Sequence, residues 1–233
     1  FDRPGALHRR IVDAAQADAP ADGLLCLGTL DHICASAMPP ATAAISGSLD
    51  TTADSRCDGG VADVCVIEAA SMLTVGATQV TGSRPLVLFS GGMIKVTGAL
   101  DASGQGTTGG PGASVNDAAC TGTAGAPGSF TSDGCTCTAA GGGAGGSFGQ
   151  QGGSGGAGGR INTSGTAPAG GVPGPIVVAT VLRAGCFGTA GGSTTATSVV
   201  GQGGGGGGAV YVVAATSIDV AAAGRIFASG GGG

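Results

Sequence analysis

Three stretches of the chain share one pattern of apolar and polar positions. They are CVIEAASMLTV (65–75), LVLFSGGMIKV (86–96) and VYVVAATSIDV (210–220). Aligned without gaps, each reads as an apolar strand, a turn of small residues and a second apolar strand. In the second strand the apolar residues flank Thr74, Lys95 or Asp219, which is the period-two pattern of a half-buried strand. The pattern predicts pairs of short β-strands that recur along the chain.

A second, shorter motif follows the strand pairs. It begins at Gly76 (GATQVTG), Gly98 (GALDASG), Gly159 (GRINTSG) and Gly224 (GRIFASG), with a degenerate copy, GSLDTTA, at Gly47. We expect Leu100, Ile161 and Ile226 to point inward from a third short strand, and the closing Ser-Gly to turn the corner. Helices are disfavoured because glycine and β-branched residues are dense. The sequence predicts an all-β fold of β-solenoid-like repeats.

Glycine-rich stretches interrupt these repeats beyond Gly104. In the longest stretch, glycine occupies every third position, at Gly143, Gly146, Gly149, Gly152, Gly155 and Gly158. A three-residue period fits an extended left-handed helix in which only glycine fits where neighbours approach closely. Shorter tracts keep the period at Gly106/Gly109/Gly112, Gly122/Gly125/Gly128 and Gly185/Gly188/Gly191. We expect interleaved polyglycine II-like segments that present their other residues outward, with flexible Gly/Ser coil as the alternative.

Composition and charge narrow the range of functions. The chain has 233 residues, of which 52 are glycine and only 10% are charged, so large side chains for a wide core are scarce. With a net charge of -5 and Lys95 as the only lysine, we expect no nucleic-acid partner. No apolar run approaches the roughly 20 residues that cross a bilayer. We therefore expect no membrane span.

The cysteines indicate disulfides. They number eight, at Cys26, Cys34, Cys57, Cys65, Cys120, Cys135, Cys137 and Cys186. An even count favours disulfides, and hence an extracellular or cell-surface location. Closeness in sequence suggests the pairs Cys26–Cys34, Cys57–Cys65, Cys120–Cys135 and Cys137–Cys186, with other pairings open. Because CxxC pairs are absent and the only histidines are His8 and His32, we expect no zinc, and we expect no other cofactor.

Matches to catalytic motifs follow from composition alone. Residues 152–156 fit G-x-S-x-G and residues 201–206 fit G-x-G-x-x-G, but neither has the strands and helices that these motifs need. Asp31 and His32 between two cysteines are typical of a solvated turn. A carbohydrate-active β-helix would need carboxylates clustered on one face. We therefore expect no enzyme.

Two resemblances rest on quoted segments. The copies VTGALDASG and GRIFASGGGG, joined by polyglycine and preceded by GGAVYVVAA, resemble the glycine-rich repeat proteins exported to the surface of myxobacteria and related bacteria. This resemblance covers roughly residues 42–233 and implies a surface location. The glycine tracts are similar in style to the polyglycine-helix bundles of a snow flea antifreeze protein and of some phage tail-fibre adhesins. This chain departs from both by interleaving strands.

These patterns divide the chain and suggest a role. We expect an N-terminal extended segment at residues 1–23 and a β-solenoid-like, disulfide-stabilised domain at residues 24–233. The expected function is that of a secreted structural protein, a filament or surface-matrix subunit that self-associates through its repeat ends and glycine tracts. One junction would lie near Val210, Val212, Ile218 and Val220, and the other near the N-terminal segment. The alternative is a glycan- or ice-binding adhesin module that uses Gln150, Gln151 and Ser154.

Overall fold

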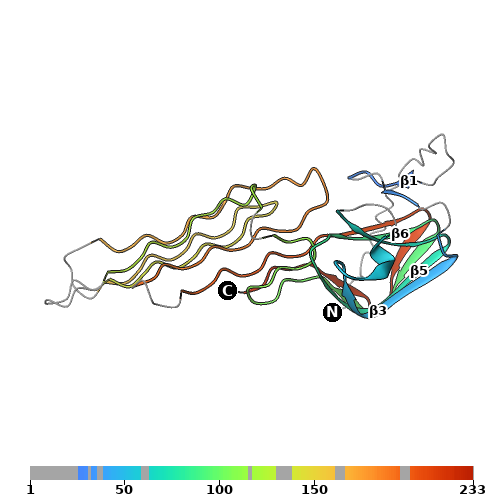
Figure 1. Cartoon of the computed structure of the whole chain (residues 1–233), viewed down its shortest axis with the longest axis horizontal. Helices are drawn as coiled ribbons and strands as arrows, with labels where there is room; N and C mark the ends of the chain where they lie inside the picture. Colours follow the sequence, from blue (N-terminus) through green and yellow to red (C-terminus); the bar gives the residue numbers. More distant parts are fainter. Residues whose placement is uncertain are drawn as a thin grey trace, which may run out of the picture.

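The computed structural model of the chain describes residues 26–30, 33–35, 39–58, 63–114, 117–129, 138–160, 166–194 and 200–232. The molecule is elongated, with its strands gathered at one end and long extended segments running back and forth along the rest (Figure 1). We call residues 26–103 and 209–227 the β region, and residues 104–208 with 228–232 the glycine-rich arm. The N-terminal segment 1–23 lies outside the described residues.

Regular secondary structure is almost entirely β, and the described residues contain no α-helix. The strands are β1 (Cys26–Leu27), β2 (Ile33–Cys34), β3 (Thr42–Asp50), β4 (Cys65–Ala69), β5 (Met72–Thr81), β6 (Leu86–Ser90), β7 (Met93–Val96), β8 (Ala99–Asp101), β9 (Val210–Ala214), β10 (Ser217–Val220) and β11 (Arg225–Phe227). One 3-10 helix, η1 (Ser55–Asp58), follows β3. The all-β prediction is confirmed.

The three eleven-residue stretches lie side by side in the register of their sequence alignment. Strands β4, β6 and β9 form a parallel sheet, and β5, β7 and β10 are parallel neighbours in a second sheet. Leu73, Ile94 and Ile218 therefore occupy one position in successive strands. The second sheet also holds β3, which pairs with β5, and β8 and β11, which pair in parallel. The three aligned stretches thus keep their sequence register within both sheets.

The shorter motif is confirmed in some copies and corrected in others. Thr78 pairs with Leu100, and Leu100 pairs with Ile226, as the aligned motifs require. The copy at Gly47 is shifted by two residues, because Leu49 pairs with Val80 rather than with Thr78. A β-bulge between Ile45 and Gly47 causes part of this shift, and Gly47 has a φ of +80°.

The copy GRINTSG does not join the stacked strands. Arg160 instead forms an antiparallel bridge with Thr138 inside the glycine-rich arm. Ile161, which we expected to point inward, lies outside the described residues. Unlike the other copies, this one follows a glycine tract rather than an apolar strand pair, so no sheet is present for it to extend.

The core lies between the two parallel sheets. Leu73, Ile94 and Leu100 are all 0% exposed within one cluster of buried side chains. Strand β6 is buried on both faces, because Val87 and Phe89 on its other face pack with Leu27 and Ile33 of the β1–β2 hairpin. Burial of these aliphatic side chains stabilises the β region through the hydrophobic effect.

Two of the predicted disulfides are present and two predicted pairings are wrong. Cys26–Cys34 joins β1 to β2, and Cys57–Cys65 joins η1 to β4, as expected. Cys120 pairs with Cys186, not with Cys135, so the Cys137–Cys186 pair is also excluded. Cys135 and Cys137 lie outside the described residues.

The long-range disulfide follows from the way the arm folds back on itself. Gly125 donates a hydrogen bond to the carbonyl oxygen of Ala190, so the segments that carry Cys120 and Cys186 are neighbours. An ion pair between Arg183 and Asp117 joins the same two segments. Closeness in sequence is a poor guide here, because the arm brings together residues that are 66 positions apart.

Candidate assembly surfaces

Backbone hydrogen bonds hold the arm together at intervals of three residues. The N–H groups of Ala139, Gly142 and Gly145 donate to the carbonyl oxygens of Gly159, Gly156 and Gly153 at 2.8–2.9 Å. The same period joins Gly185, Gly188 and Gly191 to Gly207, Gly204 and Gly201, each at 2.9 Å. A flat β-ladder would repeat every two residues. The spacing in the arm therefore belongs to a backbone that turns once in about three residues.

One segment of the arm bonds to neighbours on several sides. Within residues 138–148, Gly142 donates to Gly156, Gly141 donates to Ala126, and Ala144 accepts from Thr189. These partners belong to three different segments. From Gly141 to Gly159, only Gly149 has a positive φ. Backbone groups of consecutive residues thus bond to different neighbouring segments. In a β-sheet, the backbone groups of one strand bond to at most two neighbouring strands.

Most of the glycines that recur at every third position from Gly143 to Gly158 lie where neighbouring segments approach most closely. At Gly143, Gly146, Gly152, Gly155 and Gly158, an added Cβ would lie under 3.0 Å from a carbonyl oxygen of a neighbouring segment. Real Cβ atoms essentially never come that close, so a side chain at these positions would push the segments apart. At Gly153 and Gly156, each one residue after a crowded glycine, the added Cβ would have nothing within 4 Å.

Gly149 is the exception within that series. Its φ is +61° and an added Cβ would meet nothing within 4 Å. It lies in a tight turn where Phe148 and Gln150 exchange backbone hydrogen bonds. Glycine is needed here for a left-handed turn conformation, not for close packing.

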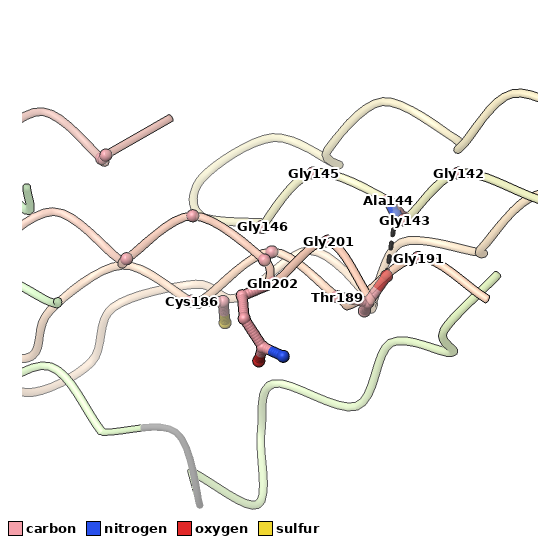
Figure 2. Close-up of a pocket in the computed structure, with 16 residues that line it drawn as sticks. Gly142, Gly143, Ala144, Gly145, Gly146, Cys186, Thr189, Gly191, Gly201 and Gln202 are labelled. Atoms are coloured by element: carbon pink, nitrogen blue, oxygen red, sulfur yellow. Dashed lines mark hydrogen bonds between the residues drawn. The ribbon is translucent and has the colours of Figure 1, made fainter. Parts of the chain in front are cut away.

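A groove of about 610 Å³ runs along the arm. Its walls are mostly the backbone of Gly142–Gly146 and of residues 201–205, which include Gln202, with Cys186, Thr189 and Gly231 among the other residues (Figure 2). The N–H of Ala144 donates to the Thr189 hydroxyl oxygen at 2.7 Å, the bond drawn in Figure 2. No ionisable side chain lines the groove. It therefore offers peptide groups to a ligand but no acid or base.

The residues predicted to face outward from the glycine tract divide into two groups. Gln150, Gln151 and Ser154 are exposed, as expected. Ala144 and Ser147 are buried, which corrects the expectation that all non-glycine positions point outward. The Ser147 hydroxyl donates to the Gly174 carbonyl at 2.7 Å and accepts from the Gly152 N–H at 3.0 Å.

The last layer of the β region leaves an apolar edge uncovered. Strands β9, β10 and β11 each pair with a single strand, within the part of the chain that the structure describes. Val210 and Val212 are half-buried against the core, whereas Ile218 is 43% and Val220 is 49% exposed. The sequence had singled out these four residues. The structure places them together along one end of the two sheets.

Two further apolar residues belong to this end. Ile226 is 42% exposed, although we expected it to point into the core as Leu100 does, and Phe227 is 44% exposed. Ile226 does align with Leu100, but no described strand lies beyond β11 to cover it. The alignment of the motif was the available signal, and it predicted the register of Ile226 without revealing that no described strand covers its layer. We call β9, β10 and β11 the apolar end.

The opposite end of the β region is polar and partly covered. The side chains of strand β3 are mostly small or polar. The Arg56 guanidinium donates to the Ala44 carbonyl of β3 at 3.4 Å. It also forms an ion pair with Asp54 at 2.7 Å, and the Arg56 hydrogen bond lowers the pKa of the Asp54 carboxyl. Cys57 of η1 is buried in the core and bonded to Cys65 of β4.

No family model, curated protein or solved structure matches this chain. The resemblance to glycine-rich surface proteins therefore stays a prediction. No group of three or more potential metal ligands occurs among the described residues. Nor does any helix there have the length and apolarity that crossing a membrane requires. The functional argument rests on the apolar end and on the arm.

Proposed function

We propose that this protein is an extracellular structural subunit that assembles with copies of itself into a filament or surface matrix. The observation that carries the proposal is the apolar end, where Ile218, Val220, Ile226 and Phe227 are exposed along strands with one free edge each, as far as the structure describes the chain. Free strand edges next to apolar side chains favour pairing with another chain. The assembly would cover these side chains and satisfy the backbone groups of the edge.

The β region acts in this proposal as a short β-solenoid. Support comes from the parallel, in-register layers and from the recurrence of apolar residues at the same positions in successive strands. Stacked repeats contact mainly their neighbours, so a terminal layer needs either a polar cap or a partner. The polar end has η1 and β3, and the apolar end has no such cap among the described residues.

The arm acts in this proposal as a bundle of polyglycine II-like segments. The three-residue period of its hydrogen bonds, the several neighbours of one segment and the crowded glycine phase all support this conformation. Glycine loses much conformational entropy when it is ordered, so single segments would not stay extended alone. Lateral hydrogen bonds and the Cys120–Cys186 disulfide offset that loss.

The disulfides support the extracellular location. Three occur among the described residues, in the β1–β2 hairpin, at η1 and in the arm. Disulfides persist in oxidising environments and are rare in the reducing cytosol of most cells. A small core held by disulfides is also typical of proteins that work outside cells.

A second candidate function is binding of a glycan or of ice. It is favoured by the exposure of Gln150, Gln151 and Ser154 at and beside the turn of the longest glycine tract. This function requires a monomer with a saturable ligand. It uses a different part of the molecule from the apolar end, so the two candidates are separable by mutation.

Electron microscopy of the purified, oxidised protein tests the proposed function. Regular filaments, sheets or defined multimers at micromolar concentration are the expected result. Discrete monomers over the whole concentration range would overturn the assembly proposal and favour the binding module. The disulfides should be kept intact, because reduction would remove the covalent links in both regions.

A further inference from the structure

The two ends of the β region are not complementary to one another. At the edge of β3, Gly47 has a φ of +80° and the Ala44 carbonyl already accepts a hydrogen bond from Arg56. Like charges that meet at an edge hinder strand pairing. The apolar end carries charges of opposite sign, Asp219 on β10 and Arg225 on β11. Head-to-tail stacking would therefore place an apolar edge against a polar and obstructed one.

The apolar end is instead complementary to itself. Consider β10 and β11 paired antiparallel with β11 and β10 of a second copy, about a two-fold axis at Ala222 in the turn that separates the two strands. Ile218 then lies opposite Ile226 of the other copy, and both belong to core-facing positions, because they continue Ile94 and Leu100. Asp219 then lies opposite Arg225 of the other copy. Residues directly opposite in an antiparallel pair share a face of the sheet, as these do.

Neither charge of this pairing has a direct ion-pair partner among the described residues. Asp219 lies beside Lys95 of β7 in the sheet register, but no ion pair within 4.0 Å joins Asp219 or Arg225 to another described residue. Arg225 donates to the carbonyl oxygens of Ala222 and Gly224 at 2.8 and 2.6 Å. Its guanidinium thus lies close to the position of the proposed axis. A second copy would supply a carboxylate there, and the two-fold axis would form the contact twice.

The third strand of the same layer is also complementary to itself. In β9, Val212 is the central residue, so an axis through it pairs Val212 with Val212 and Tyr211 with Val213 of the other copy. Val212 packs on the core, whereas Tyr211 and Val213 pack on the opposite face with Val87 and Phe89. Each face of β9 therefore meets the matching face of its copy.

The geometry points to a symmetric pair of this chain, formed end to end through β9, β10 and β11. Strand β9 pairs with β9, and β10 pairs with β11, all antiparallel across one two-fold axis. The inference rests on the proposed function, because it specifies which contact starts assembly. Such an interface is closed at that end, so growth beyond the pair would have to use other contacts, such as those of the arm.

Charge reversal tests this pairing in the full, oxidised chain. Sedimentation equilibrium measures the dissociation constant of the pair for D219R, R225D and the double variant. Each single reversal creates two like-charge contacts, so we expect the dissociation constant to rise roughly tenfold or more. The double variant exchanges the two charges and should restore it to within about threefold of the wild type.

The matched control is D63R, which reverses an exposed charge before β4, away from the apolar end. It should leave the dissociation constant unchanged, and circular dichroism checks that every variant folds. Single reversals that behave like D63R, or effects that add up in the double variant, would contradict the symmetric pair. Filaments that persist in both single variants would contradict it while leaving the proposed function standing. Monomers at all concentrations of the wild type would contradict both.

Discussion

The β region and the glycine-rich arm both satisfy their backbone against neighbouring segments, but they differ in what lies between those segments. In the β region, side chains such as Leu73 and Ile94 fill the space between two sheets. In the arm, the close approaches fall where a side chain is missing, as at Gly152 and Gly155. The first region is stabilised by buried apolar surface and the second by backbone hydrogen bonds. Removing a side chain should therefore destabilise the β region, whereas adding one should destabilise the arm.

The largest effect should come from removing a core side chain in the β region. Ile94→Ala leaves a cavity beside Leu73, and we expect a loss of about 2–5 kcal/mol in the free energy of unfolding. Ile218→Ala is the matched control, because Ile218 occupies the same position in the exposed last layer. At protein concentrations below the dissociation constant of the proposed pair, it should cost roughly 0.5 kcal/mol or less. Equal losses in chemical denaturation would show that the last layer is covered as well as the inner ones.

The disulfide of the arm should have the next largest effect. The variant C120A/C186A removes a link between residues 66 positions apart, and we expect a loss of about 2–4 kcal/mol. Peptide mapping under non-reducing conditions should first recover Cys120 bonded to Cys186. Recovery of Cys120 bonded to Cys135 would contradict the folded arrangement of the arm.

The effect of a glycine-to-alanine substitution in the arm on the free energy of unfolding should depend on its position within the three-residue period. Gly155→Ala places a Cβ against the carbonyl oxygen of Gly142, which accepts from Gly171, and we expect a loss of about 1–3 kcal/mol. Gly156→Ala is the control, because its Cβ meets nothing within 4 Å. It should be neutral, or stabilising by about 0.4–1 kcal/mol through the unfolded chain. Equal thermal unfolding temperatures for the two variants would contradict an ordered arm.

The smallest effect concerns the ion pair at the polar end. The Arg56 hydrogen bond lowers the pKa of Asp54 below its usual 3.8, so the folded state favours the carboxylate. The resulting stabilisation is present above the unfolded pKa and is lost as the pH falls through the lower folded pKa. The D54N variant should lose about 0.2–1 kcal/mol at neutral pH and lack this acid dependence. An NMR titration that finds the Asp54 pKa at or above 3.8 would contradict the pair.

The sequence was most informative where the pattern is local and repeated. The gap-free alignment of the three eleven-residue stretches predicted the pairing of Ile94 with Ile218 across 124 positions, from 94 to 218. It did not predict the register shift opposite Gly47, because the extra residue lies in β5 between Val75 and Thr78, where Gly76 and Ala77 carry no apolar signal. It also could not show that no described strand covers Ile226.

For the arm, the sequence predicted which glycines are crowded in the longest tract but not in every tract. The phase from Gly143 to Gly158 was confirmed as crowded, apart from the turn at Gly149. In the tract at Gly185, Gly188 and Gly191 an added Cβ would lie 3.4, 3.0 and 3.5 Å from its nearest atom, and the closer contacts fall on neighbouring tracts. Which phase is crowded depends on which segments are neighbours. That arrangement, like the Cys120–Cys186 pairing, is set by the tertiary fold.

Residue-specific amide hydrogen exchange in the arm tests most directly the claim that hydrogen bonds at every third residue order it. The account predicts slow exchange at Gly142, Gly145 and Gly188, whose N–H groups donate to neighbouring segments. It predicts fast exchange at Gly153 and Gly156, whose carbonyls accept these bonds while their own N–H groups donate to no described backbone carbonyl. Uniformly fast exchange across all five glycines would mean a flexible coil and would contradict the account.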